Sequence, residues 1–254
     1  MSKTVLYNNR YTALRLFVEQ LPLRFNDEGT LVQDRRNTIK MFVCNDGTEL
    51  IVKRYHLPRN INRLVYSLGI RKPKGERAYL YVERLLKKGI ESPTPIAYIE
   101  EREWGLLGYS YLVSLKCPYE HRMYELGYAT AETYEPFAQA FGEYCARLHE
   151  ADILHRDFTP GNVLWSKDGK GMYHFAIVDI NQMEFGKVSF KKGCQNICKF
   201  WGPKRMIQLI ARAYGKARGG DPEISERLVM EARHRFWLRH QRKRPNSISF
   251  KPEL

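Results

Sequence analysis

The most informative segment of this sequence is HRDFTPGNVLW, residues 155–165. It places Asp157 five residues before Asn162, and a second aspartate, Asp179, follows in the apolar run FAIVDI. An aspartate on a loop can accept the proton of an attacking hydroxyl, and amide and carboxylate oxygens are the hard donors that Mg²⁺ prefers. The spacing is typical of phosphoryl transfer of the kinase type. We therefore expect Asp157 to be the catalytic base, and Asn162 and Asp179 to be the metal ligands.

Each of these residues also has a structural interpretation. Asp157 could cap a helix expected at residues 135–150. His155 is expected to brace the loop by hydrogen bonds and not to take part in catalysis. Asp179, buried in an apolar run, would be an unpaired charge unless a cation or a donor meets it. A bound metal ion is the simplest way to satisfy that charge.

The first third of the chain has the composition of β-strands. Residues 38–44 and 49–55 are rich in β-branched and aromatic side chains, and the Asp-Gly pair in NDGT (45–48) predicts a hairpin turn between them. Lys53 follows Leu50-Ile51-Val52 in the second strand. This context is typical of the strand lysine that contacts nucleotide phosphates, although an exposed strand lysine is the alternative.

The segments around this hairpin give weaker signals. A further strand pair is expected near residues 21–25 and 31–33, with its turn at 26–29. Residues 57–74 indicate a basic connection interrupted by proline. A helix is predicted from about residue 74 to 88, because its apolar residues fall on one stripe.

That helix should carry a glutamate that fixes the strand lysine. Glu76 and Glu83 lie seven residues apart and share one face, opposite the apolar stripe. Periodicity leaves both open, and either could be a solvated helix charge. We prefer Glu76, which stands near the start of the helix.

The second half of the chain changes to helical composition. Residues 135–150 carry apolar side chains at helical spacing, residues 175–180 have the character of a strand, and residues 187–244 are helical and strongly basic. Before this change, residues 105–115 indicate a strand or two strands joined by a turn. The pattern predicts an α+β fold with a strand-rich first lobe and a helix-rich second lobe. We place the boundary between residues 113 and 114, giving a nucleotide-binding lobe at 1–113 and a catalytic lobe with basic C-terminal helices at 114–254.

Composition narrows the classes of function. The 254 residues carry 42 Lys and Arg against 28 Asp and Glu, a formal charge of +14, which favours polyanionic partners without choosing among them.

No stretch approaches 18 uninterrupted apolar residues, so we predict no transmembrane helix, and the start lacks an apolar signal core. The five cysteines are odd in number and do not suggest a set of paired disulfides, and we interpret Cys194 and Cys198 as reduced thiols on a helix. These features predict a cytoplasmic protein.

Four segments together resemble a known family, the bacterial lipopolysaccharide core kinases of the Kdo and heptose kinase group. They are ELIVKRYHLPRNINRLVY (49–66), KGERAYLYVERLLKKGIESPTPIAY (74–98), HRDFTPGNVLW (155–165) and FAIVDINQMEF (175–185). The resemblance covers roughly residues 37–200. It implies a bilobal protein-kinase-like fold and an ATP- and Mg²⁺-dependent enzyme that phosphorylates a sugar hydroxyl of the inner core.

The resemblance also implies roles for individual residues. Lys53 would pair with the nucleotide phosphates, Glu76 would fix Lys53, Asp157 would be the base, and Asn162 and Asp179 would bind Mg²⁺. We expect the nucleotide between the lobes, with Arg36, Val113 and Leu115 also contributing to its site.

The chain departs from the wider kinase pattern at two places. No G-x-G-x-x-G precedes Lys53, so the turn that covers the phosphates must use residues 26–31 or 33–37, where Arg35 and Arg36 could contact phosphate. The metal aspartate stands in D-I-N and not in D-F-G, and A-P-E is absent. These departures favour a sugar or small-molecule kinase over a regulated protein kinase.

The basic C-terminal stretch, residues 232–244, suggests a partner. It interleaves Arg and His with Phe236, Trp237 and Leu238. A solvated basic helix is the plain interpretation, and the functional one is contact with a membrane surface or a phosphoglycolipid. An RNA-binding arm is less favoured because no RNA-binding module accompanies it, and we expect no nucleic-acid partner.

The leading hypothesis is a lipopolysaccharide sugar kinase, with Kdo as the expected acceptor. Its partners would be the inner-core glycolipid and an anionic inner-membrane surface, and it would be a cytoplasmic protein peripheral to the inner face of that membrane. The alternatives are a protein Ser/Thr kinase, a small-molecule kinase of the aminoglycoside type, or a catalytically inactive kinase-like scaffold.

Overall fold

The computed structural model describes residues 2–58 and 61–243. The chain divides into two compact units, residues 1–118 and 119–254. The division falls after Pro118, a few residues beyond the boundary expected from the sequence. The last strand of the first unit runs to Leu115, beyond the expected boundary. The backbone N–H of Lys116 also donates to the carbonyl of Glu49 (2.9 Å), so this residue is still bonded to the first unit.

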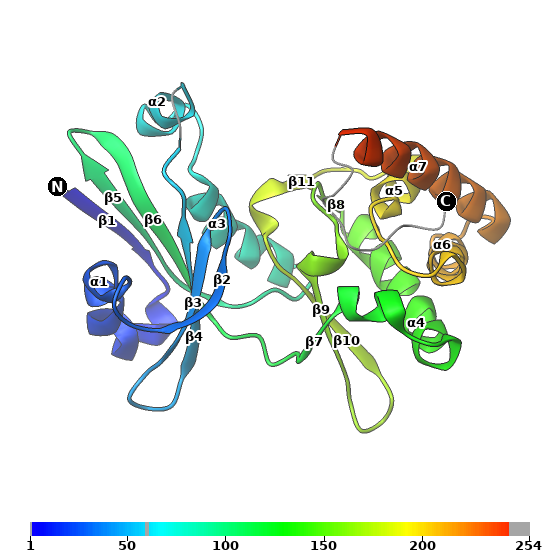
Figure 1. The fold of residues 1–254 in the computed structure, drawn as a ribbon, viewed down its shortest axis with the longest axis horizontal. Coiled ribbons are helices and arrows are strands. Elements are labelled where there is room, and N and C mark those ends of the chain that lie inside the picture. Colours follow the sequence, from blue (N-terminus) through cyan, green and yellow to red (C-terminus); the bar gives the residue numbers. More distant parts are fainter. Residues whose placement is uncertain (1, 59–60, 244–254) are drawn as a thin grey trace. The chain divides into compact units, whose positions relative to one another are not determined.

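The first unit is built on a six-stranded antiparallel sheet of order β1-β5-β6-β4-β3-β2 (Figure 1). Its strands are β1 (Ser2–Tyr7), β2 (Thr30–Asp34), β3 (Thr38–Val43), β4 (Glu49–Tyr55), β5 (Pro95–Glu103) and β6 (Leu106–Leu115). Its helices are the 3₁₀ helix Asn9–Leu14, α1 (Arg15–Arg24), α2 (Ile61–Ser67) and α3 (Lys74–Leu86). The predicted hairpin of β3 and β4 and the predicted helix at 74–88 are both present.

Side chains alternate between the two faces of this sheet, and a helix packs on each face. Val18 and Leu21 of α1 pack in one hydrophobic cluster with Leu50 and Val52 of β4, so α1 covers the face onto which these side chains point. Gly75 of α3 lies on the other face, where a Cβ added to it would stand 2.6 Å from the Tyr98 ring and 2.9 Å from the Tyr55 ring. Lys53 belongs to that second face because it alternates with Val52.

Two expectations for the first unit are wrong. Residues 21–25 do not form a strand, since they end helix α1, where Val18, Leu21 and Phe25 recur at helical spacing and are fully buried. Residues 57–74 are not only a connection, because they contain α2. The strand expected near 31–33 is present in β2, but it pairs with β3.

The second unit is mainly helical, with small sheets. Helix α4 (Ala131–Glu150) runs through its core, as the apolar spacing of 135–150 predicts, and is followed by α5 (Phe190–Ile197), α6 (Lys204–Ala217) and α7 (Pro222–Lys243). One sheet has the order β10-β9-β7 and the other pairs β11 with β8. The strands are β7 (His121–Arg122), β8 (Ile153–His155), β9 (Val163–Lys167), β10 (Tyr173–Ile177) and β11 (Met183–Phe185), and 3₁₀ helices occupy Met123–Tyr128, Pro160–Asn162 and Ile180–Gln182.

No helix within the described residues is both long and apolar enough to cross a membrane.

Candidate active site

The loop that carries Asp157 begins where β8 ends. Phe158, the next residue, is fully buried and contacts the rings of Phe141 in α4, at 6.0 Å, and Phe200, at 4.8 Å between centroids. The Asp157 side chain is 44% exposed. The loop is therefore held by an aromatic core on one side while its carboxylate remains accessible to a substrate. Asp157 does not cap α4, because that helix ends at Glu150 and its C-cap is Ala151.

His155 braces this loop, as the sequence predicts. Its Nε2 lies 3.0 Å from the carbonyl oxygen of Val178, and its Nδ1 accepts the backbone N–H of Asp157 at 3.1 Å. A carbonyl can only accept, so the proton of the neutral ring is on Nε2. Burial lowers the pKa of His155, which keeps the ring neutral and both hydrogen bonds intact.

Asn162 and Asp179 are brought together by the pairing of β9 with β10. Val163 pairs with Ile177, and the Val178 N–H donates to the Asn162 carbonyl at 3.0 Å. The Asn162 amide nitrogen donates to the carbonyl of Asp157 (2.8 Å), which closes the loop that carries Asp157. The bond uses the nitrogen of the Asn162 side chain and not its oxygen. An amide oxygen and a carboxylate at one end of a β-ladder are a donor set that fits Mg²⁺. Within the described residues no group of three or more His, Cys, Asp and Glu side chains is placed to hold a metal ion. The roles of Asn162 and Asp179 as metal ligands stay a prediction.

The third residue of the D-I-N sequence has a role that the sequence alone did not reveal. Asp179 adopts a left-handed backbone conformation (φ 56°), which is uncommon for a residue other than glycine. The buried Asn181 donates from its amide nitrogen to Asp179 Oδ1 at 2.5 Å. Asp179 itself is only half-buried, so the expectation of a fully buried aspartate is wrong. Asn181 fixes the orientation of the carboxylate.

Lys199 is a residue of this site that sequence reasoning missed. Its Nζ lies 3.9 Å from Asp157 Oδ1 and also donates to the carbonyl of Arg156. Its side chain is 25% exposed. Lys199 follows α5, far along the chain from the H-R-D segment, and stands among many lysines and arginines. Only the fold indicates that one cation faces the Asp157 carboxylate.

A chain of buried hydrogen bonds supports the loop from the helical side. Asn196 of α5 donates from its amide nitrogen to the carbonyl of His155 at 3.0 Å, and its Oδ1 accepts from His149 Nε2 at 3.1 Å. The other nitrogen of His149 lies 3.1 Å from the hydroxyl of Tyr214 in α6. Burial lowers the pKa of His149 to about 4, so this histidine is neutral at pH 7. Three helices therefore fix the position of the strand end that leads into Asp157.

In the first unit, register places Lys53 on the face that α3 covers. Lys53 pairs with Leu112 of β6, which in turn pairs with Tyr98 of β5, so these side chains point to the same side of the sheet. The Lys53 Nζ lies 5.2 Å from the centroid of the Tyr55 ring. Tyr55 and Tyr98 are the rings against which Gly75 packs. The helix that carries the candidate glutamates thus lies on the face of Lys53.

The two glutamates of α3 differ in burial. The Glu76 side chain is 18% exposed and pairs with Lys72, whereas Glu83 is 73% exposed and pairs with Lys87 at 2.7 Å. Burial of Tyr98 raises the pKa of its phenol, and the charge of Glu76 contributes to that shift, which indicates that the two groups are near each other. These observations favour Glu76 as the partner of Lys53, and the pairing stays a prediction.

The structure separates the two turns that could cover phosphates. Residues 26–29 form a turn that follows helix α1. Lys40 donates to the carbonyls of Phe25 (2.7 Å) and Glu28 (2.9 Å), and Gly29, at φ 80°, packs on the Phe42 ring. Lys40 pairs with Val52, so this turn lies on the α1 side of the sheet, away from the face of Lys53.

The second candidate turn joins β2 to β3 and contains the exposed Arg35 and Arg36. Thr38 donates to the Asp34 carboxylate across this turn at 3.0 Å, and Asn37 accepts the backbone N–H of His56 at 3.2 Å. The turn is therefore shaped by its own polar side chains while two guanidinium groups remain exposed. Of the two candidates, the structure favours the one with Arg36.

Val113 and Leu115 lie at the end of β6. The Val113 side chain is fully buried in the hydrophobic cluster on the α1 face. Leu115 is partly buried against the same cluster, and its N–H donates to the carbonyl of Thr94 at 2.9 Å. Both residues have structural partners, and their contact with a nucleotide stays a prediction.

The basic C-terminal stretch is only partly what the sequence predicted. Residues up to 243 belong to α7, and residue 244 lies outside the described residues. Arg233 is fully buried and Trp237 is 4% exposed, so the expectation that these two side chains face a membrane is wrong. Cys194 and Cys198 are buried thiols at α5, and burial raises the pKa of both.

Comparison with known families gives one match. The profile of the lipopolysaccharide kinase (Kdo/WaaP) family matches residues 24–192, a range that contains Arg36, Lys53, Glu76, Asp157 and Asp179. A search of curated protein sequences finds no match.

Comparison with solved structures gives the fold. An amicoumacin kinase, hAmiN, solved with AMP-PNP, Ca²⁺ and amicoumacin, is 12% identical at a TM-score of 0.53, over 95% of this chain and 90% of its own. The Rio2 kinase of Chaetomium thermophilum, solved with ADP, Mg²⁺ and phosphoaspartate, is 14% identical at 0.50, over 92% and 77%. WaaP in complex with acyl carrier protein is 13% identical at 0.49, over 94% of both chains. The chain has a kinase-like α+β fold.

Proposed function

Because this chain belongs to the lipopolysaccharide kinase (Kdo/WaaP) family, we propose that it transfers the γ-phosphoryl group of ATP to a sugar hydroxyl of the lipopolysaccharide inner core, with Kdo as the acceptor. The observation that carries the proposal is the catalytic loop of the second unit. There Asp157 has an accessible carboxylate, and its backbone carbonyl accepts a hydrogen bond from Asn162. The Asn162 carbonyl in turn accepts the N–H of Val178, the residue before Asp179. A hydroxyl acceptor needs a base of this kind, and a nucleotide needs the metal ligands.

In the proposed reaction the acceptor hydroxyl gives its proton to the Asp157 carboxylate while its oxygen forms a bond to the γ-phosphorus. The bond from that phosphorus to the bridging oxygen breaks, and ADP leaves with the electron pair. The hydrogen bond from the Asp157 N–H to His155 sets the backbone of the base, so that little reorganisation is needed during transfer. Burial lowers the pKa of His155, and the neutral ring preserves this arrangement.

Mg²⁺, held by Asn162 and Asp179, would neutralise charge on the phosphate oxygens. Asn181 would keep the Asp179 carboxylate turned toward the ion, since it holds one of the two carboxylate oxygens. The amide nitrogen of Asn162 is already used by the Asp157 carbonyl, so its amide oxygen would be the atom that binds the cation.

Lys199 would supply a second positive charge at the reacting phosphoryl group. Its Nζ already lies 3.9 Å from Asp157 Oδ1, and the transferred group must pass close to that carboxylate. Positive charge that is in place before reaction stabilises the charge that develops on the phosphoryl oxygens. The T-P-G-N part of the catalytic loop contains no cation, so Lys199 would fill this role from another part of the chain.

The first unit would bind the nucleotide phosphates. Lys53 would contact them, Glu76 would fix Lys53 once it exchanges its Lys72 partner, and Arg36 in the turn between β2 and β3 would cover them. The register that puts Lys53 on the α3 face and the low exposure of Glu76 support these roles. The acceptor is a glycolipid, so we place the enzyme at the cytoplasmic face of the inner membrane.

An acceptor panel tests the proposal. The purified protein is incubated with ATP and Mg²⁺ and, separately, with lipid A that carries Kdo, the same core carrying heptose, an aminoglycoside and a Ser/Thr peptide. We expect ADP release with phosphate on the Kdo-bearing glycolipid, found by mass spectrometry. Phosphate on the aminoglycoside or the peptide alone would establish one of the competing kinase functions, and absence of ATP turnover with every acceptor would indicate an inactive scaffold.

A further inference from the structure

Large aliphatic side chains are exposed over a short stretch around helix α2. Ile61 is 75% exposed, Leu64 51%, and Leu68 and Ile70 72% each, and Trp104, in the turn between β5 and β6, is 95% exposed. Single exposed apolar residues are ordinary on a protein surface, but a group of them marks an interaction site. We call these five residues, Ile61, Leu64, Leu68, Ile70 and Trp104, the α2 surface.

Helical periodicity explains why the aliphatic side chains gather on one side. Ile61, Leu64 and Leu68 recur at i, i+3 and i+7 and therefore line one stripe. Tyr66 is buried, and Ser67 and Arg63 contribute to hydrogen bonds with the sheet. The side of α2 that faces the protein is thus its polar and aromatic side, while its aliphatic side faces outward. This orientation is the reverse of that expected for a helix that only packs on its own domain.

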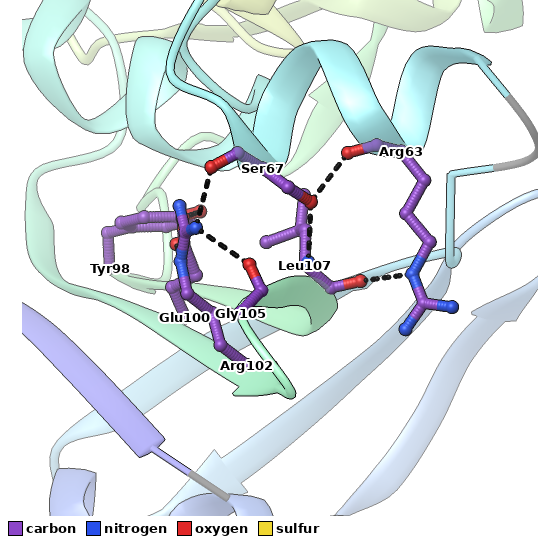
Figure 2. A network of polar contacts seen from close by, with 7 residues as sticks. All are labelled: Arg63, Ser67, Tyr98, Glu100, Arg102, Gly105 and Leu107. Carbon is purple, nitrogen blue, oxygen red and sulfur yellow. Dashed lines mark hydrogen bonds and ion pairs between the residues drawn. The ribbon is translucent and has the colours of Figure 1, made fainter.

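A polar network holds α2 in this orientation (Figure 2). Arg63 Nε donates to the carbonyl of Leu107 at 2.9 Å, and the Leu107 N–H donates to Ser67 Oγ at 2.8 Å. The Ser67 hydroxyl donates to the carbonyl of Arg63 at 2.6 Å. Helix and strand β6 are therefore joined by directional bonds that fix which side of α2 points outward.

The same network joins the turn that carries Trp104 to the end of α2. Arg102 Nη1 donates to the carbonyls of Ser67 (2.9 Å) and Gly105 (3.2 Å), and buried Glu100 pairs with Arg102 at 2.6 Å (Figure 2). Trp104 has a left-handed backbone (φ 53°), which needs support from its surroundings in a bulky residue. The tryptophan and the aliphatic residues are thus parts of one braced structure.

Charge around the α2 surface favours an anionic occupant. Residues 57–74 contain five Lys and Arg and no Asp or Glu. Arg71 and Lys72 are exposed beside Ile70, and Lys72 is the partner of Glu76. Glu103, next to Trp104, is the acidic side chain at the edge of the surface. Aliphatic side chains and a tryptophan flanked by cations are the composition of an element that lies in the interface of an anionic bilayer.

We propose that the α2 surface inserts into the headgroup region of an anionic membrane and that Arg71 and Lys72 contact lipid phosphates there. The inference deepens the proposed function, on which it rests for the presence of a glycolipid acceptor in such a membrane. It assigns membrane contact to α2 and the turn between β5 and β6, in place of the α7 stretch whose Trp237 is buried. The four aliphatic residues of the surface lie in the chain between β4, which carries Lys53, and α3, which carries Glu76.

Vesicle co-sedimentation tests the proposal with the full chain. The parent protein is compared with a variant carrying Ile61→Ser, Leu68→Ser, Ile70→Ser and Trp104→Ser, on phosphatidylcholine vesicles with and without phosphatidylglycerol. The matched control is Leu16→Ser with Leu23→Ser, two α1 side chains that are 73% and 82% exposed. A second control neutralises the exposed α7 cations Arg235, Arg239, Arg242 and Lys243.

We expect the parent to bind the anionic vesicles and the α2 variant to lose roughly a hundredfold in partitioning, since several large apolar side chains no longer enter the interface. Both controls should bind within about twofold of the parent. Equal binding of parent and α2 variant, or binding lost only in the α7 control, would overturn the proposal. So would absence of parent binding at low salt, in which case a protein partner is the better occupant.

A second readout separates this inference from the proposed function. The tryptophan emission of the parent minus that of a Trp104→Phe variant should shift to shorter wavelength on anionic vesicles, whether or not the protein phosphorylates any acceptor. Binding through α2 without phosphate transfer to the glycolipid would contradict the proposed function alone. Transfer to a detergent-dispersed glycolipid at the parent rate by the α2 variant, together with unchanged vesicle binding, would contradict this inference alone.

Discussion

The catalytic loop of the second unit and the phosphate-binding side of the first unit are built in different ways. Asp157 leads from a strand end held by Asn196 and His149, and Phe158 packs in an aromatic core. Lys53 and Arg36, in contrast, are long cations on a sheet face and in an exposed turn. The residues proposed to move a proton or hold a metal thus have buried support, while those proposed to contact phosphates are placed by strand register and by the length of their side chains.

The largest effect should follow a change at the base itself. Asp157→Asn keeps the size of the side chain and its backbone hydrogen bonds, but it removes the proton acceptor, so turnover should fall by roughly 10²-fold or more. Nucleotide affinity should be retained, because the metal ligands are untouched, and it can be measured by calorimetry with Mg²⁺-ADP. Asp179→Asn should instead weaken Mg²⁺-nucleotide binding. Near-normal turnover of the Asp157 variant would remove this residue from the mechanism.

Lys199→Met is expected to have the next largest effect. Loss of the charge near Asp157 should lower kcat roughly thirtyfold, less than the loss of a fully buried oxyanion donor because Lys199 is partly exposed. The KM for ATP should change little, because the first unit and the metal would still hold the nucleotide. Lys191→Met, an exposed position on α5, is the matched control and should behave as the parent. An equal effect of both changes would show that only overall charge matters.

The two glutamates of α3 provide a test substitution and its control in the first unit. Glu76→Gln should lower kcat/KM for ATP about tenfold, equivalent to about 1.4 kcal/mol, because Lys53 loses its fixing partner. Glu83→Gln should leave it unchanged, since that side chain is 73% exposed and pairs only along the helix with Lys87. If the Glu83 variant is the impaired one, the assignment of Glu76 is wrong.

The smallest effect should come from acid, through the buried histidines. Burial lowers the pKa of His149 to about 4, below the unfolded value near 6.5, so the unfolded chain binds a proton more readily between these two pH values. The free energy of unfolding should therefore fall as pH drops below 6.5, by roughly 1 kcal/mol near pH 5.5. His155, whose pKa burial also lowers, adds to the loss in the same direction.

Urea unfolding across this pH range measures the effect. A His149→Gln variant, which has no group to protonate at this position, should show a shallower loss of stability toward acid than the parent. Identical slopes for parent and variant would contradict the assignment of the acid sensitivity to His149.

The candidate residues of the Asp157 loop could be chosen from the sequence, because the chemistry proposed for them needs given residue types at fixed spacing. Asp157, Asn162 and Asp179 lie within a short length of chain, and the pairing of β9 with β10 that joins them is local. Lys199 could not be predicted, since its position beside Asp157 results from the packing of α5 under the loop. The role of Asn181 was equally hidden, because the sequence shows only a departure from D-F-G.

The errors in the first unit have the same origin. Residues 21–25 read as a strand because LPLRF alternates apolar and other residues and contains Pro22, yet packing of Val18, Leu21 and Phe25 against the sheet makes them helical. The choice between the two phosphate-covering turns also depended on which side of the sheet each turn occupies. In α7, composition suggested an interface, but Arg233 and Trp237 proved to be core residues.

Mass spectrometry of lipopolysaccharide can show whether this chain phosphorylates the inner core in cells. Lipopolysaccharide is isolated from cells that carry the parent gene, no copy of it, or the Asp157→Asn variant at equal protein levels. We expect one phosphate on the inner-core sugar in the strain with the parent gene. We expect this phosphate to be lost in the strain without the gene and in the Asp157→Asn strain. An inner core with the same phosphate in all three strains would contradict the assignment of this chain as the kinase of that sugar.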